Sequence, residues 1–190
     1  MRLFSAFLLD DSVRAELSRV AVKLARTCGG VRWVPAEQLH VTVKFLGDVP
    51  DGDVVRVAEA MKEGAKRAEA FEFDIAGCGC FPPRGPVRIV WAGASEGSEA
   101  MTRAANAICG SLETMGFAPE PRAWSPHITI GRVKEDLSDG RIRAAAEACG
   151  FPPIRQSVRQ VSLMQSTLSP KGSTYVQVGH AALGVSSASE

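Results

Sequence analysis

The stretch LHVTVKFLG at residues 39–47 is the most informative part of the sequence. Its β-branched residues predict a strand, in which successive side chains face opposite sides. Val41 and Val43 can then enter a hydrophobic core, while His40 and Thr42 share the other face. An imidazole and a hydroxyl side by side on that face indicate a site at which something is bound.

The same pattern occurs a second time as HITI at residues 127–130, within SPHITIGRV. Both copies read His, β-branched, Thr, β-branched, and each lies in a convincing strand. Since the chain has only three histidines, two such matches by chance have odds of roughly a few in a thousand. We interpret the pair as one arrangement built twice, once in each half of the chain.

Length and composition indicate an ordinary globular chain. Its 190 residues fit one domain, or two small lobes that share a core. A net charge of +1 argues against a broad polyanion-binding surface but allows a local phosphate pocket. No apolar run approaches the roughly 20 residues that cross a bilayer, and the odd, scattered set of five cysteines favours free thiols. We therefore expect a cytoplasmic monomer that has no membrane partner.

Strands and helices alternate along the chain, and hairpin-like strand pairs favour an α+β fold with antiparallel pairing. The expected strands cover residues 2–9, 31–34, 40–43, 71–77, 87–93, 125–133, 152–166 and 173–180. The expected helices cover about 12–27, 53–69, 98–116 and 138–149. Residues 181–190 are small and polar, and we expect them to form a flexible tail.

Two histidines and two hydroxyls suit the cleavage of a phosphodiester without a metal. Because an unperturbed imidazole has a pKa of about 6.5, one ring can be neutral at neutral pH while the other is protonated. One then takes a proton from the attacking water or hydroxyl, and the other protonates the leaving oxygen. The in-line reaction requires the two rings on opposite sides of the phosphate, and the threonine hydroxyls can hold its non-bridging oxygens.

A two-histidine metal site is an alternative interpretation of these residues. It lacks a convincing third ligand, because His180 lies near the end of the chain and no carboxylate stands at ligand spacing from either motif. The pair Cys78 and Cys80 does not have Cys-x-x-Cys spacing, and we expect a turn there. We predict no metal.

The residues around both motifs resemble the two-histidine phosphoesterase superfamily, most closely its RNA 2',3'-cyclic phosphodiesterase branch, also called the 2'-5' RNA ligase family. The resemblance covers about residues 2–180 and rests on RLFSAF, VRWVPAEQLHVTVKFLGDV, FPPRGPVRIVWAG and RAWSPHITIGRV. It implies a single bilobal domain over residues 1–180. The two pseudo-symmetric lobes of antiparallel sheet would have outer helices and a V-shaped central cleft that carries both motifs.

By position, the resemblance implies that His40 and His127 are the catalytic residues, with His40 as proton donor and His127 as proton acceptor. The roles must exchange if the reaction runs backwards. Thr42 and Thr129 would bind the phosphate of the substrate. Arg132, five residues after His127, matches a family arginine near the phosphate.

Other residues are candidates for contacts with a nucleoside or RNA. Trp124 stands where a phenylalanine is expected in an Arg-x-Phe-x-Pro-His run, and its ring could stack on a base or ribose, or face the core. Arg122 begins that run, and Arg84 lies in a proline-rich turn from which it could steer RNA toward the cleft. Lys44 is expected to face away from the first motif and to be solvated.

The resemblance implies an enzyme that opens RNA 2',3'-cyclic phosphates to 2'-phosphomonoesters, with 2'-5' ligation as the reverse reaction. Its partners would be RNA ends or small cyclic-phosphate nucleotides. No cofactor is expected, because the sequence has no glycine-rich phosphate loop. One alternative keeps the chemistry and changes the substrate to another cyclic phosphate or a 2'-5' oligonucleotide. Another is a non-catalytic module that binds RNA ends, against which the two intact motifs argue.

Overall fold

The computed structural model of the protein describes residues 1–119, 123–170 and 172–184. Its strands are β1 (Arg2–Leu8), β2 (Val31–Trp33), β3 (His40–Asp48), β4 (Phe71–Phe81), β5 (Ile89–Ala94), β6 (His127–Val133), β7 (Ile154–Val158), β8 (Gln160–Ser169) and β9 (Gly172–Ala182). Its helices are α1 (Asp11–Ala25), α2 (Val54–Lys66), α3 (Ser98–Glu113) and α4 (Arg141–Glu147). The fold is α+β, as predicted.

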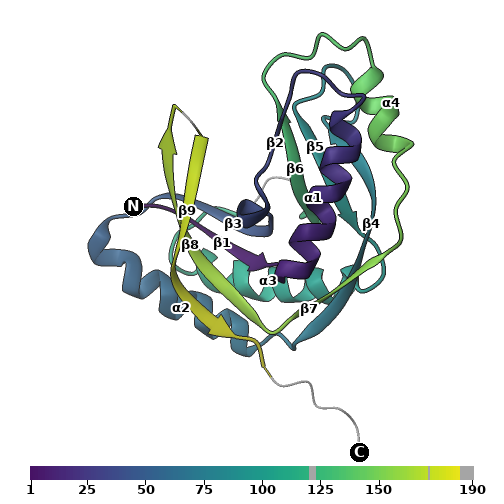
Figure 1. Ribbon diagram of the computed structural model, residues 1–190. Coiled ribbons are helices and arrows are strands. Elements are labelled where there is room, and N and C mark those ends of the chain that lie inside the picture. The colour runs from purple at the N-terminus through teal and green to yellow at the C-terminus, as the bar shows by residue number, and fades with distance from the viewer. Residues whose placement is uncertain (120–122, 171, 185–190) are drawn as a thin grey trace, which may run out of the picture.

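The strands form one antiparallel sheet in the order β7-β4-β5-β6-β3-β1-β8-β9, and β2 pairs with β6. The sheet divides into two lobes where β3 meets β6. One lobe holds β1, β3, β8 and β9, and the other holds β2, β4, β5, β6 and β7. Within the described residues, Val41 and Ile128 are the one residue pair in ladder register between the lobes. The lobes diverge from this seam (Figure 1).

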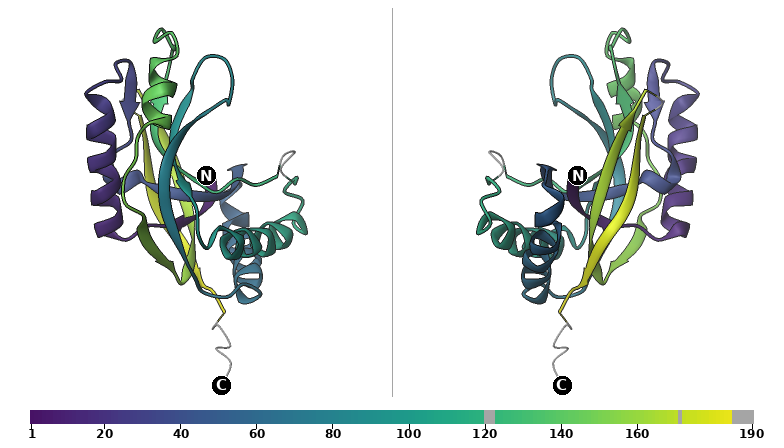
Figure 2. Two further views of the ribbon diagram at one scale, coloured as in Figure 1. Left: turned by 90° about the vertical axis from the view of Figure 1, so that its right-hand side faces the viewer. Right: turned by 90° about the vertical axis from the view of Figure 1, so that its left-hand side faces the viewer.

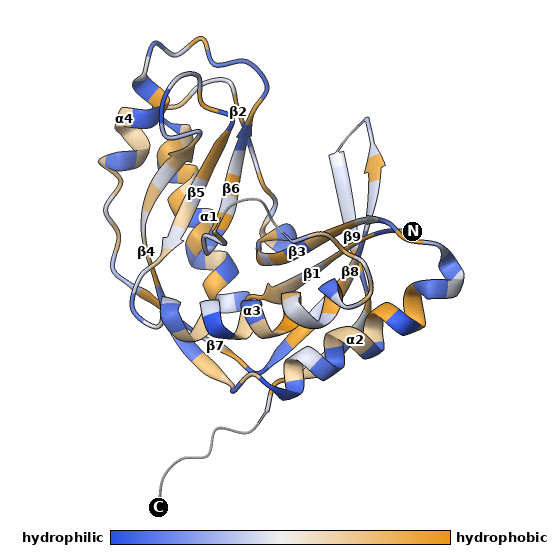
Figure 3. Cartoon of the chain, turned by 180° about the vertical axis from the view of Figure 1, so that it is seen from behind, coloured by the Kyte–Doolittle hydropathy of each residue, from blue (hydrophilic) through white to orange (hydrophobic). Residues whose placement is uncertain are grey.

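The helices lie outside the sheet (Figure 2). In α1, Val13, Leu17, Val20 and Leu24 share one face at three- and four-residue spacing, and all four are buried, as predicted. Hydrophobic and hydrophilic segments alternate along α2 in the same way (Figure 3). In the part of the chain that the structure describes, no helix is long and apolar enough to span a bilayer.

Helices α2 and α3 pack closely because of a glycine. A Cβ added at Gly64 in α2 would lie 2.6 Å from Cα of Ile108 in α3. The pair contacts both lobes, since α2 packs on β9 and β8 while α3 packs on β3 and β4. The two helices therefore pack against strands of both lobes and connect them.

Several expected boundaries are wrong. The single strand expected over residues 152–166 is two strands, β7 paired with β4 in one lobe and β8 paired with β1 in the other. The turn expected at Cys78 and Cys80 begins later. Strand β4 has a register shift between Ile75 and Cys78 and continues through both cysteines to Phe81. The last helix is shorter than expected, covering Arg141–Glu147. Residues 181–184 are not a flexible tail, because Leu183 is buried and residue 184 bridges to residue 69. Residues 185–190 lie outside the described residues.

Candidate active site

The two histidines open the two strands that meet at the seam. In this antiparallel pair Val41 lies opposite Ile128, so the strand direction places His40 on the side of Thr129 and Thr42 on the side of His127. Val41 and Ile128 are fully buried. Their burial leaves the histidines and threonines on the opposite, open face of the sheet.

Both imidazoles are held in the same orientation. Nδ1 of His40 donates to the carbonyl of Gln38 at 2.7 Å, and Nδ1 of His127 donates to the carbonyl of Ser125 at 2.8 Å. A carbonyl oxygen can only accept, so Nδ1 carries the proton and Nε2 of the neutral ring carries a free lone pair. Both motifs thus leave Nε2 outside the backbone hydrogen bond, and in His40 it faces the hydroxyl of Thr42.

The surroundings of the His40 imidazole favour its neutral form. Burial lowers its pKa below the usual value, and the nearby positive charge of Arg132, followed by that of His127, lowers it further; the hydrogen bond to Gln38 acts in the opposite direction. Nε2 of His40 lies 3.0 Å from Oγ1 of Thr42. The threonine hydroxyl can donate to that nitrogen.

A β-bulge follows the threonine in each histidine strand. The ladder between β3 and β1 skips Val43, and the ladder between β6 and β5 skips Ile130. An extra residue exchanges the two faces of the strand for the residues that follow it, up to the next bulge. The fifth residue after each histidine, which plain alternation would put on the far face, therefore returns to the open face. These residues are Phe45 and Arg132.

Two adjoining pockets meet at His40, Arg132 and Tyr175. The smaller pocket has a volume of about 60 Å³ and is also lined by Arg32, Trp33 and Thr129. The larger has a volume of about 400 Å³ and is also lined by Arg2, Phe4, Thr42, Phe45 and Leu168. The structure thus brings His40, both threonines and Arg132 to one cleft.

Arg132 and Arg32 lie opposite each other in the ladder between β6 and β2. Both side chains are exposed and line the smaller pocket. Neither forms an ion pair with a carboxylate in the described parts of the chain. Two unneutralised guanidinium groups beside a hydroxyl make a site for an anion.

Aromatic rings that sequence reasoning missed flank both histidines. The centroids of Phe4 and Tyr175 lie 5.0 and 5.4 Å from that of His40, and the centroid of Phe81 lies 5.0 Å from that of His127. These rings come from strands distant in sequence from the motif that each one contacts. The sequence places these aromatic residues in or next to predicted strands, and it carries no other signal of their contacts with the histidines.

The remaining predicted contact residues lie elsewhere. Trp124 packs against the hydrophobic core, and its Nε1 donates to the carbonyl of Thr42 at 3.0 Å. Like His127, it lines neither pocket, and its contacts are those of the alternative in which the ring faces the core. Arg84 is exposed in the turn between β4 and β5 and also lines neither pocket. Arg122 lies outside the described residues.

Lys44 faces away from the first motif, as expected, but it is not solvated. Its side chain is 1% exposed. The reason is the bulge at Val43, which turns the next residue toward α3. Among the described residues, no group of three or more His, Cys, Asp or Glu side chains is arranged to hold a metal ion.

Known proteins that resemble the chain share both its sequence and its fold. The family model for LigT-like phosphoesterases matches residues 8–91 and residues 93–175, so each match contains one histidine strand. The chain is 35% identical to the RNA 2',3'-cyclic phosphodiesterase of Archaeoglobus fulgidus, over 92% of this chain and 96% of the relative. It is 33% identical to the protein of that name from Methanothermobacter thermautotrophicus, over 94% and 96%.

Solved structures of similar proteins have the same fold as this chain. TT0787 of Thermus thermophilus matches with a TM-score of 0.77 and 29% identity, over 98% of this chain and 100% of that one. The structure of E. coli LigT complexed with NADP+ has the same fold, with a TM-score of 0.73 at 24% identity, over 96% and 97%.

Proposed function

The chain belongs to the LigT-like phosphoesterase family, and we propose that it opens the 2',3'-cyclic phosphate at an RNA end to leave a 2'-phosphomonoester. Relatives named RNA 2',3'-cyclic phosphodiesterase support the substrate. The observation that carries the chemistry is the matched orientation of the two histidines, each with Nδ1 bound to a carbonyl and Nε2 available. A matched acid and base is what an in-line phosphoryl transfer requires.

In the proposed reaction a water molecule attacks phosphorus while Nε2 of His127 takes its proton. The bond between phosphorus and the 3'-oxygen breaks, and Nε2 of protonated His40 donates a proton to that oxygen. The new oxygen stays on phosphorus, so the product is a 2'-phosphomonoester and a free 3'-hydroxyl. Thr42, Thr129 and Arg132 hold the non-bridging oxygens. With a 5'-hydroxyl as the attacking group in place of water, the same site would make a 2'-5' linkage.

The order of the histidines requires His40 to gain a proton before it can donate one. Its pKa is low in the unbound protein, chiefly through burial, and the charge of Arg132 contributes. A cyclic phosphodiester carries one negative charge, which would offset Arg132 and raise the pKa of His40. Substrate and proton are therefore taken up together.

The two pockets suggest how the substrate lies. The smaller, about 60 Å³, fits the phosphate between Thr129, Arg132 and His40. The larger, about 400 Å³, opens past Thr42 to the exposed ring of Phe45 and has room for a nucleoside. Aromatic rings at such a site bind bases by stacking without strong base preference.

The protein acts as a cytoplasmic monomer in this proposal. His40, both threonines and Arg132 line the two pockets, and His127 begins the neighbouring strand of the same chain, so the proposed site needs no second subunit. The described structure forms no disulfide from the five cysteines, which suits a reducing compartment.

The test is hydrolysis of a short RNA that ends in a 2',3'-cyclic phosphate, with EDTA present throughout. We expect the wild type to form the 2'-phosphate, and His40→Ala and His127→Ala each to lose at least about 100-fold in kcat, as expected for removal of a general acid or base. Binding of RNA without turnover by the wild type would contradict the proposal and favour a module that only binds RNA ends. Turnover of other cyclic phosphates but not of RNA would keep the chemistry and replace the substrate.

A further inference from the structure

The larger pocket continues past the groups that act in the proposed reaction. In the ladder between β1 and β3, Ala6 is opposite Thr42 and Arg2 is opposite Asp48. Thr42 and Arg2 both line the pocket. Arg2 stands four residues before Ala6, which is about 14 Å at the usual rise of about 3.4 Å per residue. The pocket therefore has a second end that is well separated from Thr42.

The side chain of Arg2 lies on the open face of the sheet. Successive residues of a strand face opposite sides, and Leu3 is buried in the hydrophobic core. The ring of Phe4, by contrast, lies beside that of His40. Arg2 and Phe4 therefore share the open face. Arg2 is exposed there, so its guanidinium is accessible to a ligand in the pocket.

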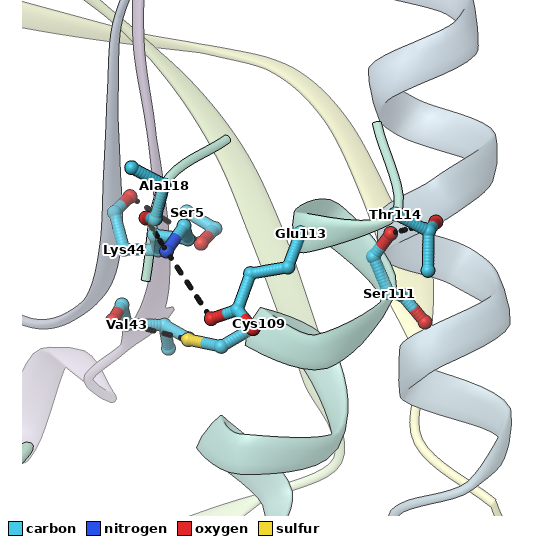
Figure 4. A network of polar contacts seen from close by, with 8 residues as sticks. All are labelled: Ser5, Val43, Lys44, Cys109, Ser111, Glu113, Thr114 and Ala118. Atoms are coloured by element: carbon cyan, nitrogen blue, oxygen red, sulfur yellow. Dashed lines mark hydrogen bonds and ion pairs between the residues drawn. The ribbon is translucent and has the colours of Figure 1, made fainter. Parts of the chain in front are cut away.

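Two other cations at this end of β1 and β3 are already paired. The ammonium group of Met1 lies 3.3 Å from Oδ1 of Asp51. Lys44 points toward the end of α3, where its Nζ donates to the carbonyl of Ala118 at 2.7 Å and lies 3.7 Å from Oε1 of Glu113 (Figure 4). Neither of these cations lines the larger pocket.

Arg2 has no such partner. Within the described parts of the chain its side chain forms no ion pair and no hydrogen bond, even with Asp48 opposite it in the ladder. A hydroxyl lies on its other side. Gln165 of β8 is opposite Leu3, so antiparallel pairing places the next residue, Ser166, beside Arg2. Ser166 lines the same pocket.

An unpaired guanidinium beside a hydroxyl is suited to an anion. Arginine can bind a phosphate through two parallel N–H bonds, and hydrogen bonds to charged groups are stronger than neutral ones. Arg132 and Thr129 provide the same two chemical groups in the smaller pocket. The site therefore has two places at which a phosphate can be held.

The ring of Phe45 lies between the two ends of the larger pocket. Its partner in the ladder is Phe4, which comes between Arg2 and Ala6 along β1. The order along the pocket is therefore phosphate site, aromatic ring and second cation. The last nucleotide of an RNA with a cyclic phosphate end has the same order, since its nucleoside stands between the cyclic phosphate and the 5'-phosphodiester.

We propose that Arg2 and Ser166 bind the 5'-phosphodiester of the terminal nucleotide, so that the site prefers the end of an RNA chain to a mononucleoside 2',3'-cyclic phosphate. The inference rests on the proposed function, because it places the cyclic phosphate at Arg132 and the terminal base on Phe45. One nucleotide and the extended side chain of Arg2 together span the distance along β1. A mononucleoside 2',3'-cyclic phosphate has no second phosphate and leaves Arg2 without a partner.

The kinetic test uses three substrates that end in a 2',3'-cyclic phosphate. They are adenosine 2',3'-cyclic phosphate, the dinucleotide ApA with the same end, and that dinucleotide with a neutral methylphosphonate linkage. The measured quantity is the ratio of kcat/KM for each dinucleotide to kcat/KM for the mononucleoside. We expect a ratio of about 10 to 100 for ApA in the wild type, since hydrogen bonds to charged groups contribute factors of that size. The neutral linkage should remove most of this preference.

Two substitutions should lower the ratio for ApA. Arg2→Gln should lower it about 10- to 100-fold, and Ser166→Ala about 2- to 10-fold, because it removes a single hydroxyl. The ratio isolates the 5'-phosphate, since a general change in the fold or in the catalytic groups affects both substrates. The matched control is Arg103→Gln, whose arginine is exposed on α3 and lines neither pocket. This control should keep the wild-type ratio.

A second readout is independent of turnover. Isothermal titration compares adenosine 2'-phosphate with adenosine 2',5'-bisphosphate, which differ only in the 5'-phosphate. We expect the added phosphate to lower the Kd of the wild type about 10- to 100-fold. Arg2→Gln should remove this gain, and Arg103→Gln should keep it.

A wild-type ratio near one would overturn the proposal, as would a ratio and an affinity gain that Arg2→Gln leaves unchanged. If the wild type turns over none of the three substrates, the proposed function fails. The titration with the two adenosine phosphates then still decides whether Arg2 binds a 5'-phosphate.

Discussion

Phe45 and Arg132 are equivalent residues in the two halves of the protein. Each stands five residues after its histidine, and a bulge brings each back to the open face, where both line the larger pocket. The same type of β-bulge therefore places an aromatic ring from one lobe and a cation from the other on the open face. A nucleotide needs both, a surface for its base and a charge for its phosphate.

Removal of the Phe45 ring should weaken binding of the nucleoside alone. Stacking of a base on an aromatic side chain is worth about 1–3 kcal/mol, so Phe45→Ala should raise the Kd of a nucleoside 2'-phosphate about 5- to 100-fold. Binding of inorganic phosphate should not change. Isothermal titration with both ligands tests this, with Val55→Ala, an exposed change on α2, as the control. A parallel loss of phosphate binding would show that the ring supports the fold of the site.

Arg132→Gln should weaken the binding of phosphate. Hydrogen bonds to charged groups contribute about 1.5–3 kcal/mol, so the Kd of inorganic phosphate should rise about 10- to 100-fold. Because the charge of Arg132 lowers the pKa of His40, the variant should also raise that pKa, which an NMR titration measures. Arg19→Gln on α1 serves as the control, and a variant with wild-type phosphate affinity would remove Arg132 from the site.

Phosphate should raise the pKa of His40 in the wild type. An anion beside Arg132 offsets part of the charge that disfavours the imidazolium. NMR titration of His40 with and without saturating inorganic phosphate measures the difference. If the pKa of His40 stays low with phosphate bound, His40 is the proton acceptor in hydrolysis and His127 the donor.

The low pKa of His40 should also make the fold sensitive to acid. The unfolded chain binds a proton at this residue near the ordinary pKa of about 6.5, whereas the folded chain resists protonation because the ring is buried. The stability due to neutral His40 is therefore full above about pH 6.5 and is lost as pH falls toward the folded pKa. Urea unfolding should show a larger loss between about pH 7.5 and pH 5 for the wild type than for His40→Gln. Equal losses of unfolding free energy in the two proteins would contradict a lowered pKa of His40 in the folded protein.

Two glycines test the packing of α2 on α3. Gly64→Ala would place a Cβ 2.6 Å from Cα of Ile108, whereas nothing lies within 4 Å of a Cβ at Gly110. Alanine in an open helical site gains about 0.5–1 kcal/mol over glycine, so Gly110→Ala should raise the free energy of unfolding. Gly64→Ala should lower it by about 1–3 kcal/mol, as overpacking does. If both variants are stabilised, the helices are not in close contact at Gly64.

Sequence periodicity could predict the α+β class and the two histidine strands, because each strand carries strong local signals before and at its threonine. The division into two lobes was predicted from the family resemblance. Periodicity could not predict the bulges. Gly131 in ITIGR is a weak signal, because an isolated glycine in a strand often marks a bulge, but VTVKF contains no such signal, and a bulge also depends on the partner strand. Plain alternation therefore could not explain Arg132 on the open face, and the side chain of Lys44 was wrongly predicted to be solvated.

Contacts between segments distant in sequence could not be predicted either. Trp124 faces the core because the carbonyl of Thr42 accepts its indole N–H, a partner 82 residues away. The rings of Phe4 and Tyr175 meet His40 only through the order of β1, β3, β8 and β9. Local patterns carry no information on such neighbours.

The one ladder pair between the lobes among the described residues marks an axis of near-twofold symmetry. Val41 and Ile128 hold the same place in the two motifs and lie opposite each other, so a half-turn about a line between them carries His40 onto His127 and Thr42 onto Thr129. A phosphorus atom on that line meets one imidazole from each side. The opposite placement that the proposed acid and base require thus follows from the repetition of one strand, without a separate arrangement for each. The same half-turn exchanges the two histidines, so the proposed proton donor and acceptor occupy equivalent places, as a reversal of the proposed reaction would require.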